Sequence, residues 1–291
     1  MVKNFLLFVA FIPFLLRAQP GDSTQHTEVN TKRLRTVAIA GGLGYGAAMT
    51  GLHVLWYKDQ PRQSFQFFND NAEWKQVDKL GHFYSAFYLS YGAASTYSWC
   101  GLSPKKSALL GAVTGFCSML PVEVFDGFSQ AYGASTGDLL ANAGGTALFL
   151  AQTALWNEMR IYPRFSFHRT DFAKIRPDIL GDNLTSEILK DYNGQTYWLS
   201  FDLDKFFHFP EWLNVAVGYG ASDMVYARDT PNREAGYAAY RQYYFSLDPD
   251  LRAIRTRSKV WRTVIFIAGM IKLPAPTLEV SKGNVHFHLF Y

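Results

Sequence analysis

The sequence Asp78-Lys79-Leu80-Gly81-His82 opens one of several long stretches of small and apolar residues, and it decides how the first half of the chain folds. Two more polar motifs interrupt such stretches, Glu123-Val124-Phe125-Asp126 and Ser135-Thr136-Gly137-Asp138, and Asn142 follows the second. A carboxylate in apolar surroundings is costly unless it has a partner. We therefore expect these polar side chains to contact one another inside a helical bundle.

Residues 35–160 are expected to form a domain of about four helices. Pro104 suits the first turn of one helix, and Ser135 with Asp138 forms a carboxylate variant of the capping box at the start of another. Glycine and alanine are frequent enough for the helix backbones to approach closely, either in a bilayer or in a tightly packed soluble bundle. The expected apolar stretches are Val37–Trp56, His82–Leu102, Pro104–Phe125 and Leu139–Trp156.

The polar residues share helix faces. Asp78 and His82 are four residues apart, and Glu123 and Asp126 are three apart, so each pair lies on one side of its helix. A histidine that meets several carboxylates is compatible with a general acid/base site, an oxygen-rich metal site or a buried network that fixes helix packing. The candidate catalytic residues are His82, Glu123, Asp126 and Asp138, and the candidate binding or structural cluster is Asp78, Lys79, Ser135 and Asn142.

Each of these residues also has a purely structural interpretation. Asp78 can cap a helix that begins near Lys79, Ser135 and Asp138 can act as caps, and His82 can be a hydrogen-bonded core histidine. No nucleophile elbow, phosphate loop, cysteine-pair zinc pattern or His-Glu-x-x-His helix occurs in the chain. The sequence therefore assigns no metal ligand and no cofactor, and it leaves open whether the protein is an enzyme.

The same motifs resemble those of a known family. Asp78–Phe83, Glu123–Asp126 and Gly133–Asp138, followed by Asn142, resemble the YfiM-like family of predicted periplasmic lipoproteins over about residues 74–150. A more distant likeness is to VanZ-like membrane proteins, which share the Asp-Lys-x-x-His opening. The resemblance implies an exported protein of the cell envelope and implies no reaction. The chain departs from the family in lacking the lipid-accepting cysteine and in carrying a long β-rich extension.

Residues 1–18 are predicted to be a signal peptide. Lys3 supplies a positive start, Phe5–Leu16 is an apolar run of twelve residues, and Ala18 precedes Gln19 at a plausible cleavage point. Twelve residues are too few for a membrane span, which needs about 20. Export permits disulfides, but Cys100 and Cys117 lie on either side of an expected turn at different heights, so we expect two free, buried thiols.

Residues 161–291 are expected to be a β-rich extension, which makes the fold class α+β. The segment Arg164–Gly194 is polar and irregular, and Arg255–Met270 has the apolar pattern of a helix. Short β-branched and aromatic runs predict antiparallel strands at Thr196–Leu203, Leu213–Tyr219, Tyr240–Leu247 and Val285–Tyr291. We expect the strands to pack on the helices as one unit, because four or five short strands need a partner layer.

The last expected strand leaves two interpretations open. Its apolar residues alternate with His286 and His288, and the chain ends on Tyr291, as outer-membrane strands often end on an aromatic residue. Four or five strands are fewer than the eight of the smallest membrane barrels, so a closing strand of a small soluble sheet is equally compatible. The two histidines face the same side of the strand, where we expect them to be ordinary surface residues rather than metal ligands.

Composition limits the partners. The net charge of +4 is spread along the chain with a mild cluster at residues 252–262, which indicates a solvated face rather than a nucleic-acid site. Aromatic residues make up 16% of the chain and suit membrane–water boundaries. Mean hydropathy is −0.07, which argues against a polytopic inner-membrane protein. We expect an outer-membrane or periplasmic location, with the inner membrane as the alternative, and membrane or outer-membrane proteins as partners, without nucleic acid or a small-molecule cofactor.

These observations support two main functional hypotheses. The first is a non-catalytic envelope protein, with a helical domain docked at a membrane and a β-rich interaction surface. The second is an envelope enzyme that acts on a lipid or glycan, with His82 as acid/base, Glu123 or Asp126 as its carboxylate partner, and Asp138 orienting the substrate or a metal. A small transport or channel element is the third.

Overall fold

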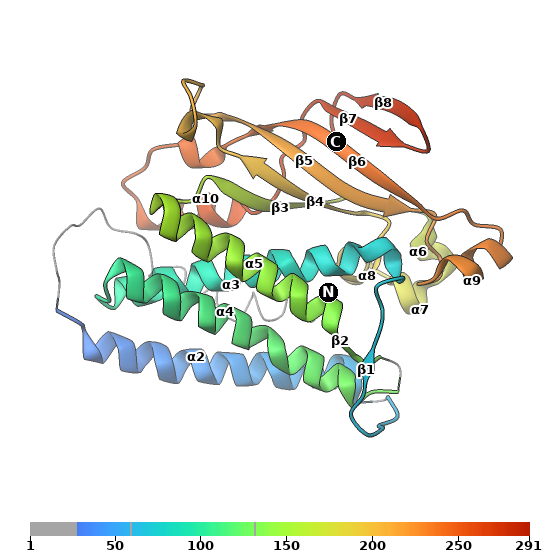
Figure 1. Ribbon diagram of the computed structural model, residues 1–291, viewed down its shortest axis with the longest axis horizontal. Helices are drawn as coiled ribbons and strands as arrows, with labels where there is room; N and C mark the ends of the chain where they lie inside the picture. The colour runs from blue at the N-terminus through green and yellow to red at the C-terminus, as the bar shows by residue number, and fades with distance from the viewer. Residues whose placement is uncertain (1–27, 59, 131) are drawn as a thin grey trace. The chain divides into compact units, whose positions relative to one another are not determined.

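The computed structural model describes residues 28–58, 60–130 and 132–291, so the predicted signal peptide and its cleavage point lie outside the described residues. The fold is α+β, as predicted: long helices occupy the first half of the chain and an antiparallel sheet the second (Figure 1). The chain divides into two compact units. The helical unit contains residues 28–70 and His82–Glu158, and the sheet unit contains Asn71–Gly81 and Met159–Tyr291.

Four long helices form the helical domain, as predicted, although the first begins before residue 35, and local capping explains where they begin. The first starts six residues earlier than predicted, because the Asn30 side chain accepts a hydrogen bond from the backbone N–H of Arg33 at 2.9 Å. The second starts at Val77, so Asp78 lies in its first turn and the prediction that Asp78 caps it is wrong. The bounds are α2 Thr31–Leu52, α3 Val77–Trp99, α4 Pro104–Gly127 and α5 Thr136–Trp156.

The start of α5 confirms the predicted cap. The Ser135 hydroxyl accepts a hydrogen bond from the backbone N–H of Asp138 at 3.1 Å. Ser135 also ends the short strand β2 (Ala134–Ser135), which pairs in parallel with β1 (Phe67–Phe68). This pairing brings Asp70 to the start of α5, where its carboxylate accepts a hydrogen bond from the Ser135 hydroxyl.

Helices α3 and α4 approach each other through small residues. A Cβ added at Gly115 would lie 2.1 Å from the hydroxyl oxygen of Ser90, and one added at Gly111 would lie 2.5 Å from the Cβ of Ala94. The two glycines are one turn apart, and so are the two residues that they meet, which is the small-residue spacing of closely packed helices. A separate apolar core joins α2, α3 and α4 around Leu52, Leu89, Met119 and Val122.

The sheet is a six-stranded antiparallel meander in which consecutive strands are neighbours (Figure 1). The predicted strands are confirmed, and two more were missed. One of these, β3, contains Pro163, which lacks a backbone N–H and is tolerated because β3 is an edge strand. The strands are β3 Ile161–Phe167, β4 Gln195–Phe201, β5 Leu213–Ser222, β6 Tyr240–Pro249, β7 Thr277–Ser281 and β8 Asn284–His288.

Short helices complete the sheet unit. The stretch that was predicted to be irregular, Arg164–Gly194, contains the end of β3 and three of them, and the helix predicted at Arg255–Met270 is shorter. Asn71–Gly81 joins this unit, where the backbone N–H of Trp74 donates to Ala227 at 2.7 Å and Lys75 pairs with Asp229 at 2.7 Å. The helices are α6 Phe172–Ile175, α7 Pro177–Leu180, α8 Leu184–Lys190, α9 Asp229–Glu234 and α10 Lys259–Ala268.

The two faces of the sheet have reversed polarity. In β6 the residues Tyr244, Ser246 and Asp248 are buried. The residues that alternate with them, Tyr243, Phe245 and Leu247, are exposed. The same alternation holds in β7, where Thr277, Glu279 and Ser281 are buried and Leu278 and Val280 are exposed. Sheets in water usually bury the apolar side. Here the polar face is the buried one.

The cysteines are both free, as predicted. Cys100 is buried just after α3, but Cys117 lies on the exposed side of α4, so the prediction that both thiols are buried is wrong for Cys117. The apolar composition of α4 does not reveal which of its faces is covered.

We predict that Gly115→Ala lowers the free energy of unfolding by about 1–3 kcal/mol, because the new methyl group overlaps Ser90 and forces the helices apart. The control is Gly42→Ala on α2, where no atom lies within 4 Å of an added Cβ and the helix gains about 0.5–1 kcal/mol. Thermal unfolding followed by circular dichroism separates the two variants. Equal midpoints would contradict the close packing of α3 and α4.

Candidate functional site

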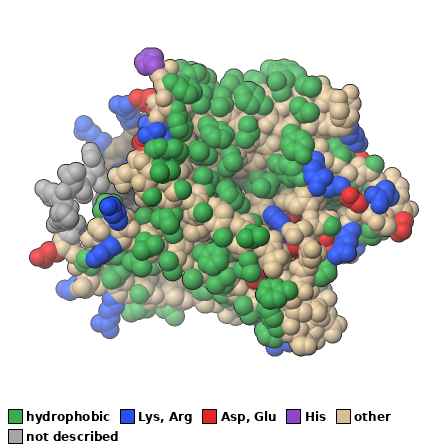
Figure 2. All heavy atoms as spheres, viewed as in Figure 1, with side chains coloured by type: hydrophobic (Ala, Val, Ile, Leu, Met, Phe, Trp, Pro, Cys, Tyr) green, Lys and Arg blue, Asp and Glu red, His purple; other side chains and the backbone are tan. Residues whose placement is uncertain are grey.

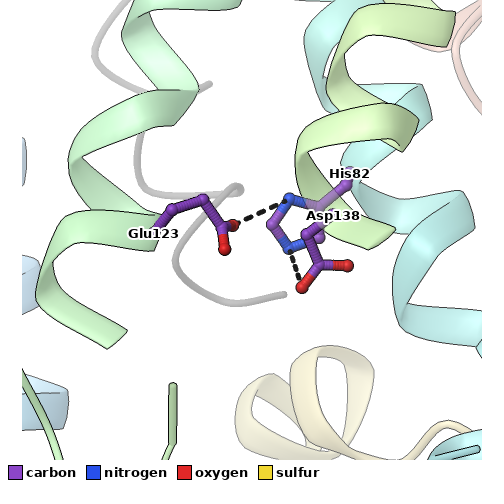
Figure 3. A group of neighbouring side chains, drawn as sticks. All are labelled: His82, Glu123 and Asp138. Carbon is purple, nitrogen blue, oxygen red and sulfur yellow. Dashed lines mark ion pairs between the residues drawn. The ribbon is translucent and has the colours of Figure 1, made fainter. Parts of the chain in front are cut away.

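His82 lies between two carboxylates that come from two other helices (Figure 3). Its Nδ1 is 3.7 Å from Oε1 of Glu123 on α4, and its Nε2 is 3.6 Å from Oδ2 of Asp138 on α5. The ligand atoms of these three side chains all lie within 4.8 Å of one another. The structure thus brings together polar residues that the sequence placed on three separate helices.

Asn142 and Ser135 complete this group, which we call the His82 cluster: His82, Glu123, Ser135, Asp138 and Asn142. The Asn142 amide oxygen lies 3.2 Å from Nδ1 of His82. The second carboxylate oxygen of Glu123 accepts a hydrogen bond from the backbone N–H of Ser135 at 3.0 Å. The cap of α5 therefore also holds the carboxylate of α4 in place.

Three of the predicted site residues make other contacts. The Asp126 carboxylate accepts a hydrogen bond from the Tyr57 hydroxyl at 2.8 Å. Asp78 and Lys79 belong to the compact sheet unit, and their side chains form an ion pair with each other at 3.1 Å. Helical spacing predicts which residues share a face of a helix, but it does not show which faces meet.

The His82 cluster is buried. His82 and Asp138 are each 7% exposed, Glu123 is 3% exposed and Asn142 is fully buried. Two cavities of the helical unit, of about 260 and 300 Å³, are lined by other residues of α2, α3 and α4 and of the segments that follow α2 and α4. The cluster therefore has the surroundings of a packing or closed ligand site rather than those of an open catalytic cleft.

A second buried polar group lies on the covered face of the sheet. Nε of Arg164 on β3 is 2.8 Å from Oδ2 of Asp248 on β6, and both residues are fully buried. Asp248 also accepts a hydrogen bond from the Ser200 hydroxyl and lies 3.9 Å from Nζ of Lys272. Beside it, Asp250 forms hydrogen bonds with Arg252 through both carboxylate oxygens, at 2.8 and 2.6 Å. We call these residues the Arg164–Asp248 network.

Burial shifts the protonation of this network. It raises the pKa of Asp248, and it lowers the pKa of Lys272 to about 8. Burial also raises the pKa of Asp202, which follows β4, to about 7, with a further contribution from a hydrogen bond to Asp204. For Asp250 the hydrogen bonds and charge of Arg252 outweigh burial, so its pKa is lowered.

The sequence analysis missed the Arg164–Asp248 network. The available signal was the period-two pattern of the sixth strand, where Ser246 and Asp248 alternate with Phe245 and Leu247. Arg164, the partner of Asp248, lies 84 residues earlier in the sequence. The strand that contains Arg164 was not predicted, because Pro163 is unfavourable in most strands. No local pattern links the two residues.

A family model matches part of the chain. Residues 66–153 match the family described as predicted periplasmic lipoprotein (DUF2279), a family without an assigned activity. The match covers less than half of the chain, includes the whole His82 cluster, and supports an envelope location. The Arg164–Asp248 network lies outside it. Searches of curated proteins and of solved structures gave no match.

We predict that Asp202→Asn weakens the pH dependence of stability between about pH 4 and 7. The folded protein keeps the Asp202 proton up to a pKa of about 7, whereas an unfolded chain releases it near 3.8. The contribution to stability is therefore present at low pH and is lost as the pH rises towards 7. Asp178→Asn, at an exposed position of α7, is the control.

The measurement is the free energy of unfolding at several pH values from 4 to 8. The wild-type protein and the Asp178 variant should lose stability as the pH rises, and the Asp202 variant should lose less. The same slope in all three proteins would contradict a proton held by Asp202.

Proposed function

We propose that this chain is a non-catalytic protein of the cell envelope that associates with a membrane, at the outer membrane. The observation that carries the proposal is the reversed polarity of the sheet. Exposed hydrophobic surfaces of this extent are uncommon on proteins that face only water. Strands with an apolar outer face and a polar inner face are typical of proteins of the outer membrane.

The exposed apolar residues form a continuous surface, because they pair across strands. Val217 on β5 lies opposite Phe245 on β6, which lies opposite Leu278 on β7, and Leu278 lies opposite Phe287 on β8. All four are at least 43% exposed. Figure 2 shows hydrophobic side chains gathered over these strands. We call this surface the apolar sheet face: Val217, Tyr243, Phe245, Leu247, Leu278, Val280, Val285 and Phe287.

The helix α10 supports the same proposal. Val260 and Trp261 on this helix are 67% and 60% exposed, although they are apolar. A groove of about 450 Å³ lies between α10 and the turn that follows β6. The segment also carries Arg262, and it is preceded by Arg255, which pairs with Glu211 at 3.0 Å. An exposed apolar helix face with neighbouring cations is typical of helices that lie at the surface of an anionic membrane, so we assign the basic cluster to this role.

The helical unit exposes apolar side chains as well. Leu43 on α2 and Leu140 and Leu155 on α5 are each more than 70% exposed. Within the described residues one helix, α4, is long and apolar enough to cross a membrane by length and composition alone. These surfaces are compatible with a helical unit that docks at the membrane, and we propose that the two units act together there.

An envelope enzyme is the second candidate function. It is favoured by the position of His82, which has a carboxylate near each ring nitrogen, an arrangement that can tune an acid/base group. Burial of the whole cluster favours the non-catalytic proposal. A folded His82→Ala variant with normal yield that lost a cellular phenotype would favour the enzyme, whereas a loss of folded yield would favour the packing role.

We predict that the wild-type protein floats with vesicles of phosphatidylethanolamine and phosphatidylglycerol in a density gradient. Leu278→Glu should weaken binding about tenfold or more, because it places a charge in the centre of the apolar sheet face. The matched control is Leu184→Glu at an exposed position of α8, outside that face, which should bind as the wild type does. Circular dichroism confirms that both variants are folded.

Two results would contradict the proposal. One is a wild-type protein that stays at the bottom of the gradient at every lipid concentration. The other is equal weakening by both substitutions, which would show that the apolar sheet face has no special part in binding. Self-association of the wild-type protein without lipid would identify a second copy as the occupant of this face.

A further inference from the structure

We infer that the His82 cluster is a structural site for a divalent transition-metal ion, bound by His82, Glu123 and Asp138, with the amide oxygen of Asn142 orienting His82. The inference concerns the interior of the helical unit and does not depend on the proposed membrane association. All four residues lie within that unit. A single ion would tie together α3, α4 and α5.

The separations between His82 and the two carboxylates are longer than direct hydrogen bonds. The two separations between His82 and the carboxylates, 3.7 and 3.6 Å, exceed the usual N–H···O range, which ends at about 3.2 Å. Two ligand atoms that each lie about 2.1 Å from one ion are about 3.0–3.6 Å apart in the common geometries. The two separations involve opposite ring nitrogens, and one ion can bind only one of these. One potential ligand atom of each residue lies within 4.8 Å of the others, so the carboxylate on the far side of the ring must move towards the ion to complete the site.

The Asn142 amide is the second, independent observation. Its oxygen points at His82 from 3.2 Å, while its nitrogen is buried and has no hydrogen-bond partner. Leaving a buried N–H group unsatisfied costs about 1–3 kcal/mol. With this orientation the amide oxygen can accept the Nδ1 proton of His82, so that the lone pair of Nε2 faces Asp138 and is available to a cation.

The donor types indicate the class of ion. An imidazole nitrogen suits zinc, iron, nickel or copper, and carboxylate and amide oxygens suit manganese and harder ions. Calcium and magnesium favour oxygen-only sites, which makes them poorer candidates. With Nε2 of His82 bound to the ion, Nδ1 keeps its proton and donates it to the Asn142 amide oxygen, 3.2 Å away. Metal-bound histidines commonly have this second contact.

The site is closed rather than catalytic. Structural metal sites are filled by protein ligands, whereas catalytic sites keep a position open for water or substrate. Here the ligands come from helices, and each is less than 10% exposed. The backbone N–H of Ser135 fixes one oxygen of Glu123, so the other oxygen is oriented towards His82 before the ion binds.

The test uses the full mature chain, purified without a histidine tag, stripped with EDTA and dialysed against Zn²⁺. We expect about one zinc per chain by mass spectrometry of the metal content, and a rise in the thermal midpoint that EDTA reverses. Zn²⁺ and Mn²⁺ should raise the midpoint more than Mg²⁺. His82→Ala and Glu123→Gln should weaken zinc binding about 100-fold or more.

Two control variants and one variant that should respond more strongly to zinc make the test decisive. His208→Ala and Glu211→Gln, at exposed positions of the sheet unit, should bind zinc as the wild type does. Asn142→Asp adds a third carboxylate with little change in volume. With a metal site, zinc should raise the midpoint of this variant by more than it raises that of the wild type.

Several results would overturn the inference. Zinc bound equally by the wild type and by the His82 and Glu123 variants would place the ion elsewhere. A wild-type midpoint that responds to neither zinc nor manganese would identify the cluster as a hydrogen-bonded network only. An Asn142→Asp variant that is destabilised and not rescued by either ion would do the same, even if the alanine variant fails to fold.

Discussion

The buried ion pair between Arg164 and Asp248 is the constraint on which the sheet depends. Neighbouring residues of a strand point to opposite faces, so placing these two charges inside forces Phe165 and Leu247 to the other face. A buried charge that loses its partner is strongly destabilising. A shift of register by one residue would expose the network and bury the apolar sheet face, and the pair therefore fixes which face meets the surroundings.

In the helical unit, too, polar side chains lie inside and large apolar side chains lie outside. Its polar residues meet in the His82 cluster, and its helices approach through glycines such as Gly111 and Gly115 rather than through large apolar side chains. Large apolar residues such as Leu43 and Leu140 are left on the outside. In both units polar side chains cluster inside and large apolar side chains are exposed, which is the arrangement that a lipid environment favours.

Much of this arrangement could be predicted from the sequence where the signals are local. The cap at Ser135 and the helical spacing of the polar motifs gave the four long helices and the core of the His82 cluster. The parts that were missed depend on tertiary context. Pro163 kept the edge strand β3 from being predicted. No sequence pattern links Arg164 to Asp248. The composition of α4 does not show that Cys117 lies on its exposed side. Asp78 and Lys79 share helix α3 with His82, yet they group with the sheet unit through contacts that spacing does not encode.

The most direct measurement of the central claim is photo-crosslinking of the protein, bound to vesicles, with a lipid that carries a reactive group in its acyl chain. Mass spectrometry then identifies the labelled peptides. If the apolar sheet face meets lipid, the label should concentrate in Tyr240–Pro249 and Thr277–Ser281, on exposed residues such as Phe245 and Leu278, and should be sparse around Leu184. Labelling that is absent from these two strands, or equally dense around Leu184, would contradict the claim that this face was built for a membrane.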